Sequence, residues 1–344
     1  MIAKVAGVGA RGAVGLSSLQ MAMGIRSRLF EPRSLPWLDK RGREMGMALS
    51  GGLGIASHGV ERFVALATPA LSEAAALLLR APGSGAQGVP LVVCLPEPGR
   101  PDDDPRMNGA ILSTLMESTG IAVDLARSSV VREGQAGFAM ALGKAKALLD
   151  GGAGSVLVGG VDSYYHRGVL EWLDRGHRLH ALDAEDGIVP SEAAAFLLLQ
   201  RGKGAGSGAV LYAESGREPN AADGGEPNLA GTTTGLLERA QAATGGPIRW
   251  AITDLNGERH RQREWQMASG RALATDYELT KWAWSLGDVG AASGPVYAAV
   301  ALTMMRLGLA PAERAVIALH SEGVERGVVV LEEKASVRVA EVAS

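Results

Sequence analysis

Short apolar runs that favour strands alternate with longer segments of helical periodicity along almost the whole chain, and this alternation limits the possible folds most strongly. Strands are predicted at residues 3–8, 90–95, 155–158, 194–200, 209–213, 250–254, 315–319 and 327–331. Helices are predicted at residues 16–29, 69–80, 109–118, 134–149, 233–243, 260–273 and 291–307. Such an order is typical of βαβ units around parallel or mixed sheets, and it predicts a layered α/β protein.

The length of the chain predicts two units. A chain of 344 residues is longer than one hydrophobic core usually serves. A Gly/Ser-rich stretch at residues 201–208 and a polar, turn-rich stretch at 216–231 interrupt the alternation near the middle. We therefore predict an N-terminal half at residues 1–205 and a C-terminal half at 206–344, each with a similar order of strands and helices.

Composition and charge exclude several classes of protein. The formal net charge is -3 with acidic and basic residues interspersed, so no basic surface for nucleic acid is expected. The apolar runs are far shorter than the ~20 residues that span a bilayer, and the N-terminus does not resemble a signal peptide. One cysteine, Cys94, excludes an internal disulfide. A cytoplasmic protein without a membrane segment is expected.

A glycine pattern near the N-terminus resembles a dinucleotide-binding fingerprint. Gly7-x-Gly9-x-x-Gly12 lies between a predicted strand and a predicted helix, where that fingerprint belongs. Residues 24–29, however, do not form the second strand with an acidic end that nucleotide binding also requires. We favour a tight strand-to-helix turn over a nucleotide site.

Two further candidate sites receive structural interpretations. Cys94 lies inside an apolar strand, where burial disfavours the thiolate, so a structural role is expected. His177-x-x-His180 with Asp183 has the ligand types of a metal site, but the spacing in a loop is a weak signal. We favour a solvated loop and expect no metal.

Five segments, taken in order, carry a more specific signal. The first opens the helix at residues 134–149, and the second is the end of the strand that follows it. The segments are Gly134-Gln135-Ala136-Gly137, Val156-Leu157-Val158-Gly159-Gly160-Val161-Asp162-Ser163, Asp186-Gly187-Ile188-Val189-Pro190-Ser191-Glu192-Ala193-Ala194-Ala195, Asp254-Leu255-Asn256-Gly257 and Gly287-Asp288-Val289-Gly290-Ala291-Ala292-Ser293-Gly294. Together they resemble the β-ketoacyl-acyl-carrier-protein synthases of the thiolase superfamily over residues 3–332.

This resemblance implies a fold and a set of site positions. The fold is the five-layer α-β-α-β-α arrangement of two similar halves. The family's nucleophilic cysteine corresponds to Gln135, or to Gly134 in the alternative alignment, and its two histidines correspond to Asn256 and Asp288. Four further positions match the family's substrate-binding segments: Gly134, Ile188, Gly287 and Gly290.

The replaced residues argue against condensation. A Claisen condensation needs a thiolate to hold the acyl group and hydrogen-bond donors to stabilise the developing oxyanions. Gln135 cannot carry the acyl group, and an ionised Asp288 would repel negative charge, whereas the amide of Asn256 still has donors. A glutamine at the nucleophile position resembles the chain-length factors of aromatic polyketide synthases.

Three functions follow from the resemblance. The first is a non-condensing subunit or acyl-thioester-binding partner in fatty-acid or polyketide-type biosynthesis. The second is a cysteine-independent acyltransferase or thioester hydrolase, which would make the protein an acyltransferase of the β-ketoacyl synthase type. The third is a purely structural pseudoenzyme. The implied partners are an acyl carrier protein or a CoA thioester, and either a second copy or an active ketosynthase in a dimer. The implied ligand is a CoA or phosphopantetheine thioester, and no cofactor is implied.

Structural explanations remain open for several of these residues. Asn256-Gly257 is a favoured turn pair, and Asp288 suits a cap for the following helix. Four residues that follow Asn256 are interpreted as a solvated helix face, with contacts to a carrier's phosphate as the alternative; they are Arg259, His260, Arg261 and Arg263. Trp282 and Trp284 are expected to be core or interface aromatics.

Overall fold

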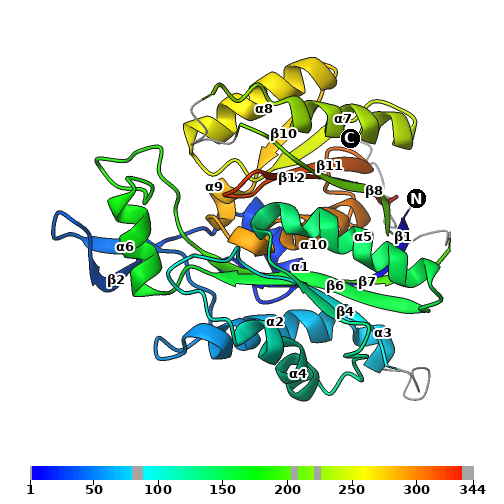
Figure 1. Cartoon of the computed structure of the whole chain (residues 1–344), viewed down its shortest axis with the longest axis horizontal. Helices are drawn as coiled ribbons and strands as arrows, with labels where there is room; N and C mark the ends of the chain where they lie inside the picture. Colours follow the sequence, from blue (N-terminus) through cyan, green and yellow to red (C-terminus); the bar gives the residue numbers. More distant parts are fainter. Residues whose placement is uncertain (1, 80–87, 203–207, 221–225, 335–344) are drawn as a thin grey trace, which may run out of the picture.

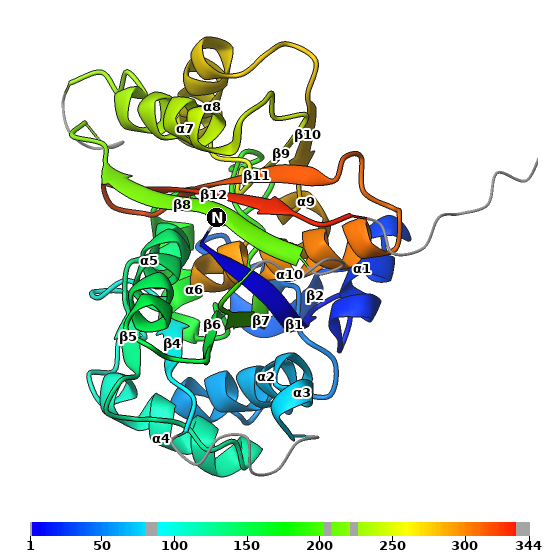
Figure 2. The ribbon, with the colours of Figure 1, turned by 90° about the vertical axis from the view of Figure 1, so that its right-hand side faces the viewer.

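The protein forms five alternating layers of helices and sheet. The computed structural model describes residues 2–79, 88–202, 208–220 and 226–334. In Figure 2, α7 and α8 form one outer layer, α2, α3 and α4 form the other, and α1, α5 and α10 lie in the middle between two sheet layers. This arrangement is the predicted α-β-α-β-α fold.

The first half of the chain supplies the sheet nearer to α2 and α4. Its elements are β1 (Ala3–Gly12), α1 (Ser18–Arg26), β2 (Arg33–Leu38), β3 (Glu44–Met47), α2 (Gly59–Ala74), α3 (Ala76–Leu79), β4 (Leu91–Cys94), α4 (Met107–Thr119), β5 (Ser129–Val131), the short 3-10 helix η1 (Gly134–Ala136), α5 (Gly137–Asp150), β6 (Ser155–Ser163), α6 (Arg167–Arg175) and β7 (Glu192–Gln200).

The second half supplies the sheet nearer to α7 and α8. Its elements are β8 (Gly208–Arg217), α7 (Gly231–Thr244), β9 (Trp250–Thr253), α8 (Arg259–Ala272), β10 (Glu278–Lys281), α9 (Ala283–Leu286), the 3-10 helix η2 (Gly290–Ala292), α10 (Ser293–Arg306), β11 (Arg314–His320) and β12 (Glu325–Glu332).

The two halves share one strand pattern. In the first, β5, β4 and β6 are parallel, β7 is antiparallel to β6, and β1 is antiparallel to β7. In the second, β10, β9 and β11 are parallel, β12 is antiparallel to β11, and β8 is antiparallel to β12. β1 pairs with β8 and joins the two sets. The predicted boundary near residue 205 lies outside the described residues, so the domain limits stay a prediction.

Small residues bring the middle helices close together. α10 is almost entirely buried, and its neighbour α5 buries one face in the same hydrophobic cluster. A Cβ atom on Gly294 would lie 2.6 Å from the Cβ of Phe138, so only glycine allows this approach of α10 to α5. Because η1 and η2 lead directly into α5 and α10, this packing also brings the two site-bearing turns together.

The glycine pattern of residues 7–12 is explained by neither a strand-to-helix turn nor a nucleotide site. All three glycines lie within β1, which continues to Gly12, so the turn predicted after residue 8 and the nucleotide site are both wrong. A Cβ on Gly7 would lie 2.2 Å from the carbonyl oxygen of Ala74, and one on Gly9 would lie 2.1 Å from that of Ala70. These glycines let α2 pack directly against the strand.

One helix begins earlier than predicted, and several short elements were missed. Pro69 lies in the interior of α2, which begins at Gly59, so the helix predicted to start at Pro69 is wrong in its first residue. β2, β3, β5, α6, β10 and α9 were not predicted, since they are short or, like β2, interrupted by a proline. α6 and β2 lie together at one end of the molecule (Figure 1). No helix in the described ranges is long and apolar enough to cross a membrane.

Candidate functional site

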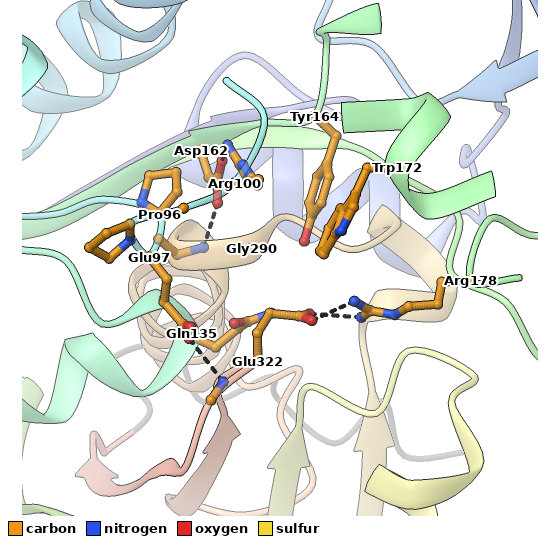
Figure 3. Close-up of a pocket in the computed structure, with 15 residues that line it drawn as sticks. Pro96, Glu97, Arg100, Gln135, Asp162, Tyr164, Trp172, Arg178, Gly290 and Glu322 are labelled. Carbon is orange, nitrogen blue, oxygen red and sulfur yellow. Dashed lines mark hydrogen bonds and ion pairs between the residues drawn. The ribbon is translucent and has the colours of Figure 1, made fainter. Parts of the chain in front are cut away.

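A pocket with a volume of about 370 Å³ lies where the turns of both halves meet (Figure 3). Its wall comes from the loop after β4, from η1, from the end of β6, from α6 and the loop after it, from η2 and from the loop between β11 and β12. The lining residues are Pro96, Glu97, Pro98, Gly99, Arg100, Gly134, Gln135, Asp162, Tyr164, Trp172, Arg178, Gly290, Ala291, Glu322 and Gly323. Several of these segments follow the carboxyl ends of parallel strands, where α/β sheets commonly bind ligands.

Of the two residues predicted for the nucleophile position, Gly134 and Gln135, only Gln135 presents a side chain to the pocket. The chain leaves β5 and turns at Gly134, whose φ is +58°. A Cβ at Gly134 would lie 2.7 Å from a carboxylate oxygen of Glu97, so both backbone conformation and space exclude a side chain there. Gln135 is 2% exposed and lines the pocket just before α5 begins. An amide therefore lines the pocket at the position where the sequence resemblance predicts the nucleophile.

The second and third predicted positions, Asn256 and Asp288, contact each other. The side-chain amide of Asn256 donates to the carboxylate of Asp288 over 2.6 Å and to that of Glu258 over 3.2 Å. Its oxygen accepts the backbone N–H of Glu258. Asp288 also accepts the backbone N–H of Gly290 over 2.8 Å, which is the kind of contact that a capping role requires.

Tyr164 separates this buried pair from the pocket. Its hydroxyl donates to Asp288 over 3.3 Å, while Tyr164 itself lines the pocket and neither Asn256 nor Asp288 does. Both amide hydrogens of Asn256 are engaged by carboxylates. The pair consequently has no donor that faces the pocket beside Gln135, and it is poorly placed to stabilise an oxyanion there.

The remaining substrate-binding positions differ in their placement. Gly290 lines the pocket, whereas Ile188 is fully buried in the cluster beside α6. Gly287 has a φ of +76°, and a Cβ there would lie 2.6 Å from the Cβ of Ser191, so this glycine serves the turn before η2. The structure thus brings Gly134, Gln135 and Gly290 to one pocket and leaves Ile188 and Gly287 outside its lining.

Sequence analysis missed most of the charged residues of the pocket. Arg100 donates to Asp162 over 2.8 Å and to Asp102, and its guanidinium lies over the ring of Tyr164. Burial raises the pKa of Asp162, and the charge of Arg100 opposes that shift. A signal did exist for Arg100, since residues 97–100 directly follow a buried strand that is parallel to its neighbours.

A buried ion network closes the side of the pocket near α8. Arg178 binds Glu258 over 2.6 Å and Glu322 over 2.8 Å, and Arg261 binds the same two carboxylates over 3.2 Å each. Arg261 also binds Asp254 over 3.3 Å. Burial alone would raise the pKa of Glu258, but the charges of Arg261 and Arg178 and the hydrogen bond from Arg178 outweigh it and lower that pKa to about 2.

This network corrects the predicted helix face. Arg261 is only 1% exposed, so a solvated role is wrong for it, because its side chain points inward toward three carboxylates. Arg259 and Arg263 are exposed, as predicted, and Arg259 pairs with Asp186 over 2.8 Å. Helical periodicity alone could not separate Arg261 from its exposed neighbours, since its partners Asp254, Glu258 and Glu322 all lie outside α8.

Cys94 and the residues His177, His180 and Asp183 lie in surroundings that explain them without a catalytic or metal-binding role. Cys94 is fully buried in β4 and does not line the pocket, and burial raises the pKa of its thiol well above the usual range. Asp183 binds Arg43, while His177 lies beside Lys40 and His180 beside a backbone carbonyl. In the described part of the chain, no cluster of three residues has the arrangement of a metal site.

The two tryptophans after β10 have different roles. Trp282 is buried and packs edge-on against Trp250 and Tyr297, with ring centroids 5.9 Å and 5.6 Å apart. It is a core aromatic, as predicted. Trp284 is 66% exposed, and its one ring contact among the described residues is a cation–π contact with the ammonium of Lys281. An interface role for Trp284 therefore stays a prediction.

Gly290 is the pocket residue whose replacement should disturb the site most directly. Its φ is +52°, and a Cβ would lie 1.9 Å from a carboxylate oxygen of Asp162. We expect Gly290→Ala to lower the free energy of unfolding by more than about 2 kcal/mol, measured by denaturant titration. Gly143→Ala is the matched control, because Gly143 lies in α5 with open space around it and should gain about 0.5–1 kcal/mol. Equal effects of the two substitutions would contradict the steric argument.

Comparisons with known proteins agree with this architecture. No protein-family model matches the sequence, and no curated protein matches it. Among solved structures, the ishigamide ketosynthase/chain length factor is similar with a TM-score of 0.72 at 17% identity, covering 96% of this chain and 99% of that one. The ketosynthase ApeO in complex with its chain length factor ApeC from Xenorhabdus doucetiae gives a TM-score of 0.71 at 14% identity, covering 96% and 97%.

A third similar structure is AntDE:AntF, described as a type II polyketide synthase acyl-carrier protein in complex with its ketosynthase bound to the hexaketide. Its TM-score is 0.74 at 14% identity, and the match covers 96% of this chain and 98% of that one. Likeness at this level of identity concerns the fold rather than the activity. The chain therefore has the thiolase-like α/β fold that these ketosynthase and chain-length-factor structures share.

Proposed function

We propose that the protein is a non-condensing, chain-length-factor-like subunit that binds an acyl chain beside Gln135 and works with a separate, active ketosynthase. The observation that carries this proposal is the amide of Gln135 in the wall of a formed pocket, at the turn that the sequence resemblance aligns with the nucleophilic cysteine of the ketosynthases. A concave site with a few convergent polar groups among apolar side chains is the usual form of a ligand pocket, and the lining around Gln135 has this form.

The surroundings of the other two positions support a role without catalysis of condensation. The side-chain amide of Asn256 donates to both Asp288 and Glu258, and Tyr164, which binds Asp288, lines the pocket in their place. Cys94 is buried elsewhere in the core and has a raised thiol pKa, so it cannot replace the missing nucleophile. The covalent route of condensation has no candidate residue in this pocket.

The chemical part of the proposal is tested with the purified protein and thioester substrates. We expect intact-mass spectrometry to show no acyl adduct after incubation with acetyl- or malonyl-loaded acyl carrier protein, because no accessible thiol is present. We also expect no release of thioester above the rate in buffer. Turnover that Asp288→Asn abolishes and Cys94→Ala does not would contradict the proposal and assign a cysteine-independent acyl transfer or hydrolysis.

The proposed partner is tested by co-expressing this protein with an active ketosynthase encoded by a neighbouring gene. We expect the two chains to copurify in a one-to-one complex, and a condensed product to form only when both are present. A ketosynthase that is fully active alone and does not bind this chain would overturn the subunit role.

A further inference from the structure

Three carboxylates and two guanidinium groups line the pocket, and Glu97 is the carboxylate among them that has no ion pair in the described ranges. Both arginines of the lining are already neutralised: Arg100 by Asp162 and Asp102, and Arg178 by Glu258 and Glu322. Glu325, near the pocket, pairs with Arg217 over 3.3 Å. Each of these carboxylates therefore has a cationic partner.

Glu97 has no such partner. In the part of the chain that the structure describes, no Lys, Arg or His lies within ion-pair distance of its carboxylate, which interacts instead with the backbone N–H groups of Gly323, over 3.5 Å, and of Glu322. Figure 3 shows this carboxylate on the pocket wall beside Gln135, across from Trp172. Burial raises the pKa of Glu97, the N–H of Gly323 opposes that shift, and the charges of Glu322 and Glu325 add to it.

An unpaired, half-buried carboxylate favours a ligand that supplies the missing positive charge. Pro96, Pro98, Trp172 and the ring of Tyr164 provide apolar surface around it, which suits a short carbon chain. A carboxylate-bearing ligand would face Glu97 and Glu322 without a free cation to bind it.

Resting on the proposed acyl-binding function, we infer that the pocket selects an acyl chain whose far end carries a protonated amine, with Glu97 as the residue that binds the ammonium group. Trp172 and the two prolines enclose the carbon chain. Acyl chains that end in a carboxylate are excluded by the same charges.

The inference is tested by measuring the binding of three probes of equal length to the purified full chain by ligand-detected NMR. The probes are hexylammonium, hexanol and hexanoate. We expect hexylammonium to bind about tenfold more tightly than hexanol, because it gains one charge-assisted hydrogen bond to Glu97. Hexanoate should bind more weakly than hexanol, because the carboxylate of Glu97 repels its negative charge. Equal affinity of hexylammonium and hexanol, or no binding of hexylammonium, would overturn the inference.

Two variants assign the effect to one side chain. Glu97→Gln keeps the shape of the residue and should reduce the affinity for hexylammonium about tenfold while changing that for hexanol by less than about twofold. Glu117→Gln is the matched control, because Glu117 is an exposed carboxylate of α4 outside the pocket, and it should change neither affinity. A loss shared by both variants would show a general charge effect and overturn the assignment to Glu97.

A last measurement distinguishes an acyl chain with a terminal amine from a simple free amine as the ligand. Aminohexanoyl pantetheine with a stable amide link should bind more tightly than hexylammonium and lose the same factor in Glu97→Gln; exclusion of this compound would overturn the acyl-chain assignment. These outcomes are independent of the partner test. If the protein forms a stable ketosynthase complex but does not prefer ammonium ligands, only this inference is contradicted. If it prefers ammonium ligands but forms no complex, only the proposed subunit role is contradicted.

Discussion

Gln135→Cys should react with iodoacetamide at least about a hundredfold faster than the wild-type protein at neutral pH. Position 135 lines the pocket and lies in η1, two residues before α5 begins at Gly137, so it is near the helix N-terminus whose dipole stabilises a thiolate. The wild-type chain contains only Cys94, whose thiol is buried and has a raised pKa. Mass spectrometry of the modified protein against time measures both rates.

Two control variants locate the reaction. The double variant Cys94→Ala with Gln135→Cys should be labelled at the same rate as Gln135→Cys alone, and Gln135→Ser should stay as unreactive as the wild type. Rapid labelling of wild-type Cys94, or an unreactive Gln135→Cys that still folds, would contradict the placement of position 135 at the nucleophile turn.

Arg261→Ala should lower the free energy of unfolding by about 3–5 kcal/mol, the largest loss of stability that we expect from a single change near the site. The guanidinium of Arg261 is buried and lies between the carboxylates of Asp254, Glu258 and Glu322. Its removal leaves buried negative charges that the remaining Arg178 neutralises only in part. Denaturant titration of the variant and the wild type measures the difference.

Arg263→Ala is the matched control for this prediction. Arg263 lies on the same helix two residues later, is exposed, and has no recorded ion pair in the described ranges of the chain. Its replacement should change the free energy of unfolding by less than about 0.5 kcal/mol. Similar losses for both variants would show that helix propensity or overall charge, and not the buried network, determines the effect.

The order of strands and helices could be predicted, because each buried element leaves a local trace in the sequence. The apolar run of β7 and the periodic pattern of α5 are visible without any knowledge of their neighbours. Elements such as α6 and β2 left a weaker trace, since they are short and pack at one end of the molecule. Pro69 misled the prediction of α2 because a proline usually marks the first turn of a helix, whereas here the helix continues through it.

The candidate site, too, could be predicted from the sequence only in part. The type of residue at position 135, an amide and not a thiol, is a property of the sequence, and an amide cannot carry an acyl group. The sequence also showed that no second thiol exists. Neither conclusion depends on where other residues lie.

Only the tertiary structure decided which charges are compensated. Arg261 is buried between three carboxylates, and Glu97 has no cation beside it among the residues that the structure describes, although both are ordinary charged residues in the sequence. The reason is that charge compensation depends on which side chains lie within a few ångströms in space: Glu322 is far from Arg261 along the chain, and even Asp254 and Glu258, which are near it, contact it only because of the fold of the turn before α8. Periodicity and motif spacing describe neighbours along the chain, so they could not assign these contacts.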